Sequence, residues 1–170
     1  AVASNETLAY AGRTWRFAPP RGRRVVRSKR ARPVWVPPDW HYVEEARKRG
    51  LRVVQLQRGQ TIDASSGTIK ARKSGGPWSW FGGSEERVLK VKGKDVVVES
   101  GGSEQPLPPG EIITAGGAVV IPPVGTRQRE FAGVLGSFRL NLGDGYALHG
   151  TQATAQLGRS VSHGCVRLAD

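Results

Sequence analysis

The segment HGTQATAQLGRSVSHGC, residues 149–165, contains two of the three histidines, His149 and His163, and the only cysteine, Cys165. The thiolate is the reactive form of cysteine, so a catalytic thiol needs a neighbour that takes its proton, and histidine is the usual one. Residues two apart on a strand point to the same face, so His163 and Cys165 would share a face if SVSHGCVRL were extended. His149 can reach the thiol only through the fold. The segment predicts nucleophilic catalysis by cysteine.

Three neighbours of the cysteine have the chemistry that acyl transfer needs. Gly164 would let backbone N–H groups approach a developing oxyanion. Arg167 could present its planar guanidinium to a carboxylate, and Ser162 could orient a histidine. These residue types favour acyl transfer on a substrate that carries a free carboxylate.

Two other interpretations of the same residues remain open. Cys165 could be a small buried hydrophobic residue, with the histidines in ordinary core or surface positions. Alternatively, His149, His163 and Cys165 could bind a metal ion, although a fourth ligand and any CxxC spacing are missing. The residue types alone do not decide between catalysis, packing and metal binding.

The elements that must position these residues are predicted to be mainly β-strands. The 23 glycines and 11 prolines make up a fifth of the chain, and the valine-rich runs are short and bounded by turn residues. Directly before the site, FRLNL, a GDG turn and YALH predict a hairpin whose second strand ends at His149. A loop carries Trp78 and Trp80, which we expect to pack on the core rather than to bind a sugar. The other predicted strands are LRVVQLQRG, EIITA, AVVIP and a hairpin in RVLKVKGKDVVVE that turns at residues 92–95.

One short helix is predicted near residues 40–49. Asp39 has the residue type of an N-cap, and Gly50 that of a C-cap. Glu44 and Glu45 precede basic residues by one turn, a spacing that stabilises helices.

Basic charge is concentrated at the start of the chain. The net charge is +12, and residues 1–52 hold 13 of the 26 Lys and Arg residues against four acidic ones. Residues 1–37 lack sustained periodicity and are predicted to be an extended basic arm with at most one strand, ahead of a domain over residues 38–170. Such an arm could bind nucleic acid, anionic lipid or an anionic wall polymer, or be merely solvated, and charge alone does not choose.

The sequence shows no membrane or leader segment. No apolar run approaches the roughly 20 residues that span a bilayer, and no charged-then-apolar leader begins the chain. We expect a soluble or already processed chain. A single cysteine cannot form an internal disulfide, so cysteine pairing does not reveal the compartment.

The motif HGTQATAQLGRSVSHGCVRL resembles the signature of the YkuD-type L,D-transpeptidases, a histidine after a strand, a spacer, and then Ser/Thr-His-Gly-Cys, a hydrophobic residue and Arg or Asn. The segments IPPVGT and GVLGSFRLNLGDGYALHGT also resemble that family, so the likeness covers about residues 112–170. It implies a mainly β, YkuD-like mixed sheet or sandwich. It also implies an enzyme of the periplasmic or extracellular cell-wall space that acts on peptidoglycan stem peptides without a cofactor or metal.

The resemblance implies a role for each residue of the motif. Cys165 occupies the position of the nucleophile, which attacks the carbonyl of the L-configured third residue of a stem and releases D-alanine. His149 occupies the position of its base. The thioester would then pass to an amine of a second stem, giving a cross-link, or to water, giving a carboxypeptidase. The other implied site residues are Gly150, whose carbonyl orients the His149 ring, His163 and Ser162, which line the site, Gly164, whose N–H belongs to the oxyanion hole, and Arg167 and Tyr146, which contact substrate.

Some alternatives stay open beside the resemblance. A sortase-like enzyme also uses Cys, His and Arg, but the local Ser-His-Gly-Cys order argues against it. A module with an inactive site could bind anionic wall polymer or, less readily, nucleic acid through residues 21–32. Relatives usually continue beyond the position of Asp170, so whether the catalytic module is complete here also stays open.

Overall fold

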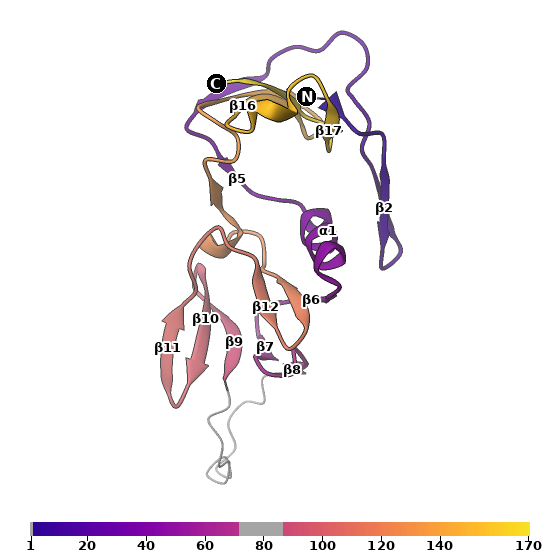
Figure 1. Cartoon of the computed structure of the whole chain (residues 1–170). Coiled ribbons are helices and arrows are strands. Elements are labelled where there is room, and N and C mark those ends of the chain that lie inside the picture. Colours follow the sequence, from indigo (N-terminus) through magenta and orange to yellow (C-terminus); the bar gives the residue numbers. More distant parts are fainter. Residues whose placement is uncertain (1, 72–86) are drawn as a thin grey trace. The chain divides into compact units, whose positions relative to one another are not determined.

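The structure is a computed structural model that describes residues 2–71 and 87–170 (Figure 1). As predicted, this part of the chain is mainly β and contains one α-helix. It divides into two compact units, unit 1 with the residues up to Trp35 and Phe131–Asp170, and unit 2 with Val36–Glu130. Trp78 and Trp80 lie outside the described residues. Within those residues, no helix has the length and apolar character to cross a membrane.

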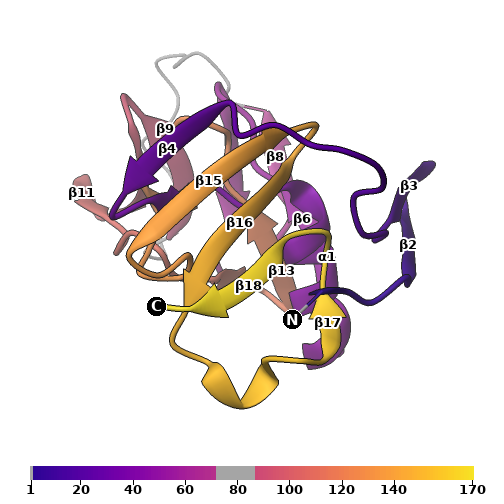
Figure 2. The same cartoon turned by 90° about the horizontal axis from the view of Figure 1, so that it is seen from above.

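A four-stranded sheet with the strand order β18-β16-β15-β4 is the centre of unit 1 (Figure 2). Strand β15 pairs antiparallel with β4 and with β16, whereas β16 and β18 run parallel. This arrangement brings the strand that contains His149 beside the strand that follows Cys165. The bounds are β4 (Ser28–Ala31), β15 (Phe138–Gly143), β16 (Tyr146–Thr151) and β18 (Val166–Ala169).

The β15–β16 hairpin turns at the predicted GDG sequence. Gly143, Asp144 and Gly145 have φ values of 84°, 53° and 80°, which glycine adopts freely and aspartate more readily than most residues. The Asn141 side-chain oxygen accepts a hydrogen bond from the Gly143 N–H at 3.1 Å, beside a shift in the strand register. Strand β16 continues to Thr151, so the predicted strand end at His149 was wrong by two residues.

The first 35 residues contribute five strands to unit 1, where the sequence predicted at most one. Strand β1 pairs with β17, β2 pairs with β3, and β5 pairs with β14. The prediction failed because strands of two to four residues are too short to show a period, and most of their partners lie far along the chain. The bounds are β1 (Val2–Ala3), β2 (Thr7–Tyr10), β3 (Arg13–Arg16), β5 (Val34–Trp35), β14 (Phe131–Ala132), β17 (Ser160–Ser162) and the short 3-10 helix η2 (Thr154–Gln156).

Part of the basic segment lies against the hairpin. Arg24 forms an ion pair with Asp144 at 2.6 Å, and its guanidinium lies 5.5 Å from the centre of the Tyr146 ring. The Arg27 N–H donates a hydrogen bond to the Asn141 carbonyl at 2.8 Å. These contacts join the segment to the strands that carry the candidate site.

Unit 2 contains two sheets and the helix. One sheet has the order β11-β10-β9-β7-β8 and the other β12-β13-β6. Leu56, Ile62 and Val96 belong to one buried cluster, and Tyr42 and Val119 belong to a second, between helix and sheet. The bounds are β6 (Arg52–Gln55), β7 (Gln60–Asp63), β8 (Ile69–Ala71), β9 (Val88–Lys92), β10 (Asp95–Ser100), β11 (Ser103–Pro106), β12 (Ile113–Ala115), β13 (Ala118–Ile121) and the 3-10 helix η1 (Arg127–Arg129).

The predicted helix is α1 (Asp39–Arg49), and Gly50 ends it in the left-handed conformation at φ 64°. The predicted N-cap was wrong, because Pro38 occupies that position and Asp39 is the first helical residue. A carboxylate in the first turn still interacts favourably with the helix dipole. The Asp39 carboxylate accepts a hydrogen bond from Arg129 at 2.6 Å, which connects the helix to η1.

Candidate active site

The SHGC sequence forms a bend between two strands. Strand β17 ends at Ser162 and β18 begins at Val166, and the two belong to different sheets. Gly164 has φ +135°, a conformation that favours glycine. SVSHGCVRL is therefore not one extended strand, so the condition under which His163 and Cys165 would share a face is not met.

Ser162 holds this bend through its hydroxyl group. The buried Ser162 Oγ donates a hydrogen bond to the Cys165 carbonyl at 2.5 Å and accepts a long one from the Gly164 N–H at 3.4 Å. These bonds go to backbone groups, whereas the sequence suggested that Ser162 orients a histidine. The hydroxyl thus sets the backbone conformation on both sides of the nucleophile candidate.

His163 packs against the N-terminal part of the chain. Its ring meets Phe17 edge-on, with ring centroids 4.5 Å apart and an interplanar angle of 82°. Phe17 is only 6% exposed. The contact holds His163 of the bend against Phe17, which lies between β3 and β4.

His149 lies in a row of residues across the sheet. It is directly opposite Arg139 on β15 and opposite Arg167 on β18. Paired residues on neighbouring strands point to the same face. Cys165 immediately precedes β18, two residues before Arg167, so continued alternation predicts that the thiol lies on the face of His149.

The His149 ring has a defined tautomer. The residue is 6% exposed, and its Nδ1 lies 2.7 Å from the Gly150 carbonyl oxygen. Because a carbonyl oxygen can only accept, Nδ1 carries the proton of this hydrogen bond. The neutral ring therefore has its lone pair on Nε2, the atom that a general base would use.

The pKa shifts of His149 and Cys165 both favour the neutral forms of these side chains. Burial lowers the pKa of His149; the Gly150 carbonyl opposes this shift, and the charges of Arg167 and Arg139 add to it. Burial raises the pKa of the Cys165 thiol, against a backbone hydrogen bond from Ala147 and the charges of Arg139 and Arg167. The same two guanidiniums thus act on both residues, which agrees with their placement on one face.

No hydrogen bond joins His149 to Cys165 in the described part of the chain. Catalytic hydrogen bonds are often long before substrate binds and shorten in the substrate complex. The directions of the two pKa shifts favour a neutral Cys165 thiol and a neutral His149 imidazole.

The remaining predicted residues surround this centre. The Tyr146 ring lies beside Gly164, close enough that a Cβ on Gly164 would be 3.3 Å from its Cε1. Arg167 donates a hydrogen bond to the Gln156 side chain at 2.9 Å. Gly150 lies against the Asp170 carboxylate, which also accepts a hydrogen bond from the Ser137 N–H at 2.7 Å. All the predicted site residues belong to unit 1.

Arg139 pairs with His149 and was not among the site residues predicted from the sequence. Counting outward from Asp144 in the predicted hairpin puts Arg139 opposite His149, and the observed register agrees. The signal was therefore present in the sequence, but only as a strand register and not as a motif.

The described residues do not support a metal centre. No three His, Cys, Asp or Glu side chains come together as ligands in residues 2–71 and 87–170. The alternative of a site formed by His149, His163 and Cys165 therefore lacks structural support.

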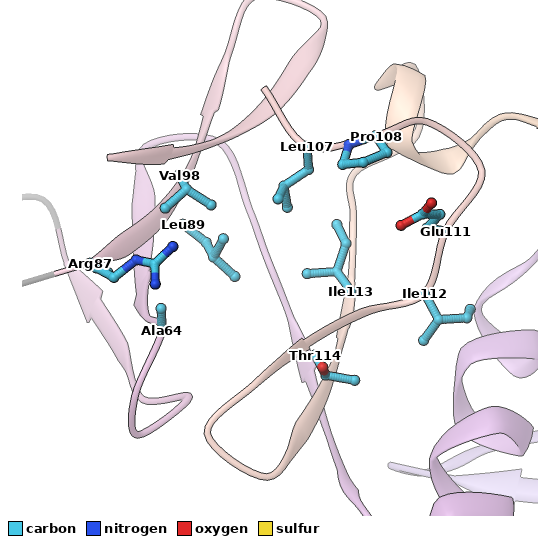
Figure 3. Close-up of a pocket in the computed structure, with 10 residues that line it drawn as sticks. All are labelled: Ala64, Arg87, Leu89, Val98, Leu107, Pro108, Glu111, Ile112, Ile113 and Thr114. Carbon is cyan, nitrogen blue, oxygen red and sulfur yellow. The ribbon is translucent and has the colours of Figure 1, made fainter. Parts of the chain in front are cut away.

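Unit 2 contains a pocket of about 350 Å³, shown in Figure 3. Its walls are mostly apolar, and Arg87 and Glu111 are the charged residues among those that line it. Neither a cysteine nor a histidine is among these lining residues. The pocket therefore lacks the residue types of the candidate site in unit 1. It is lined by Ala64, Arg87, Leu89, Val98, Leu107, Pro108, Glu111, Ile112, Ile113 and Thr114.

Comparison with known proteins extends the resemblance seen in the motif. The family model of YkuD, the L,D-transpeptidase catalytic domain, matches residues 7–170. Neither the curated proteins nor the solved structures gave a match. The family match covers both units and nearly the whole chain, including the N-terminal strands β2 to β5. The chain therefore belongs to the YkuD family of L,D-transpeptidase catalytic domains.

Proposed function

We propose that the domain cross-links peptidoglycan stem peptides, with Cys165 carrying the acyl group as a thioester. The observation that carries the proposal is the pairing of His149 on β16 with Arg167 on β18. Strand β18 begins directly after Cys165. The family match supports a catalytic domain of this type. The protein would act in the periplasmic or extracellular cell-wall space, where such stems are found.

In the first half-reaction, Cys165 Sγ attacks the carbonyl carbon of the third stem residue, and the thiol proton moves to His149 Nε2. The Nδ1 hydrogen bond to Gly150 keeps Nε2 available. The tetrahedral intermediate collapses to a thioester, and D-alanine leaves with the proton from the imidazolium. Because the resting groups are neutral, the proton moves during the attack.

In the second half-reaction, an amine of another stem attacks the thioester carbonyl. The amine loses its proton to His149, and Cys165 returns as a thiol. Backbone N–H groups of the bend, those of Gly164 and Cys165, would stabilise the oxyanion in both steps. The 3.4 Å bond from Gly164 to Ser162 Oγ is long enough to be exchanged for that contact.

The test is mass spectrometry of a tetrapeptide stem incubated with the protein, with and without an acceptor amine. We expect release of D-alanine, a covalent adduct on Cys165 and a cross-linked product. Cys165→Ala should abolish all three, and turnover by Cys165→Ala at the wild-type rate would refute the proposal. His41→Gln is the matched control, since His41 lies on α1 in unit 2 and should leave the rate unchanged.

The comparison of products with and without the acceptor amine separates cross-linking from hydrolysis. A carboxypeptidase would release D-alanine at the same rate with or without the amine and yield only the shortened stem. That outcome would keep Cys165 as nucleophile but replace transfer by hydrolysis.

A further inference from the structure

A row of basic residues crosses the central sheet of unit 1. Arg167, His149, Arg139 and Arg30 are consecutive cross-strand partners on β18, β16, β15 and β4. Directly paired side chains share a face. Basic residues therefore lie on both sides of His149 in this row: Arg167 on one side, and Arg139 followed by Arg30 on the other.

Arg139 has a buried donor without a partner. Its Nε is buried and makes no hydrogen bond, one of two such side-chain atoms in the described residues. Two other arginines, Arg129 and Arg167, have hydrogen-bonded guanidinium groups. Arg129 donates to two backbone carbonyls and to Asp39, and Arg167 donates to Gln156. Buried donors are nearly always paired in folded proteins, so the unpaired Nε sets Arg139 apart from Arg129 and Arg167.

The position of Arg139 indicates which class of ligand it would bind. Its charge acts on both His149 and Cys165, so the guanidinium lies within electrostatic range of the reacting atoms. A guanidinium pairs best with a carboxylate, which accepts two of its hydrogen bonds. In the proposed reaction, the leaving D-alanine carries a carboxylate on the carbon next to the scissile amide nitrogen.

We propose that Arg139 binds the terminal carboxylate of the acyl donor and so holds the scissile carbonyl at Cys165. This rests on the proposed function for the identity of the donor. The presence of a carboxylate subsite near Cys165 does not depend on the proposed function, because small thiol reagents can detect that subsite without a peptide substrate.

The first experiment compares alkylation of Cys165 by iodoacetate and by iodoacetamide. In both reactions the thiolate displaces iodide and forms an S–C bond, but only iodoacetate carries a carboxylate. The ratio of the two rates cancels the fraction of thiolate and reports the subsite. We expect the wild-type ratio to exceed that of a peptide of residues 160–169, which contains Cys165 and Arg167 but lacks Arg139.

The variants assign the effect to Arg139. Arg139→Gln should lower the iodoacetate-to-iodoacetamide ratio about tenfold, the size expected for one charge-assisted hydrogen bond, and Arg139→Lys should restore part of it. Arg30→Gln removes the same charge from an exposed residue of the next strand and should change the ratio less than twofold. An unchanged ratio in a folded Arg139→Gln protein would overturn the proposal. If that variant does not fold, a wild-type ratio equal to that of the peptide would overturn it as well.

The second experiment identifies the carboxylate, using tetrapeptide donors with a free or an amidated C-terminus. With the free donor, Arg139→Gln should raise KM about tenfold and change kcat less. With the amidated donor, the wild-type protein and the variant should have similar KM values. A loss of the same size with both donors would show that Arg139 does not bind this carboxylate. Failure of the proposed function would instead appear as no turnover of either donor, with the alkylation ratio intact.

Discussion

His149 and Arg167 are direct partners on the parallel strands β16 and β18. Cys165 precedes Arg167 by two residues and lies directly before β18, so the proposed nucleophile adjoins the strand that pairs with the strand of the proposed base. Sites supported by strands are held more rigidly than sites on loops alone. Residues 163–165 of the SHGC segment lie between β17 and β18 and belong to neither strand.

Alkylation of Cys165 by iodoacetamide should have an alkaline pH midpoint, above about pH 9. Burial raises the thiol pKa, so the reactive thiolate forms only as the pH rises through that value. The rate of adduct formation, followed by mass spectrometry from pH 6 to 11, measures the midpoint. A midpoint near pH 6 would show a stable thiolate–imidazolium pair and contradict the neutral resting site.

The acid limb of kcat/KM should have its midpoint below pH 6.5. Burial and two guanidiniums lower the pKa of His149, so the ring remains the neutral base at pH values where an ordinary histidine is protonated. Removing one of these charges with Arg139→Gln should shift the midpoint upward, whereas Arg30→Gln should shift it less. A midpoint of the wild-type protein above pH 7 would argue against His149 as the base.

Gly150→Ala should destabilise the protein by about 1–3 kcal/mol. Its Cβ would overlap the Asp170 carboxylate and lie 3.4 Å from the Gly136 Cα. The double variant Gly150→Ala with Asp170→Ala removes the main overlap and should be closer in stability to Asp170→Ala alone. Thermal unfolding of the four proteins measures this coupling, and strict additivity of the two effects would contradict it.

Gly164→Ala should lower the rate of thioester formation roughly tenfold or more, because φ +135° is unfavourable for alanine. The new methyl group would also be 3.3 Å from the Tyr146 ring. Adding Tyr146→Ala relieves the contact but not the backbone strain, so acylation should stay slow in the double variant. Full recovery there would mean that the ring contact, and not the backbone conformation, limits the site.

Phe17→Ala should destabilise unit 1 by about 3–5 kcal/mol, the usual cost of truncating a buried phenylalanine. Phe17 is 6% exposed and contacts His163, whereas Phe138 is 63% exposed. Phe138→Ala is therefore the matched control and should cost much less. Near-ultraviolet circular dichroism during urea unfolding can compare the variants. Equal effects would show that Phe17 does not anchor the bend.

The local features of this protein were readable from its sequence. The GDG turn, the Gly50 end of the helix and the SHGC motif each depend on neighbouring residues, whose conformational preferences act over a few positions. The mainly β class followed from the same short-range signals, and the motif was sufficient to indicate the YkuD family that the family match confirmed.

The tertiary structure decided which distant segments became partners. The N-terminal strands lack a visible period because each has only a few residues and depends on hydrogen bonds to strands such as β15 and β17. The SHGC segment is bent because Gly164 and the Ser162 hydrogen bonds end one strand before the next begins. Arg139 faces His149 because the hairpin register pairs them. Its unpaired Nε depends on the packing of side chains from several strands, which no local sequence pattern specifies.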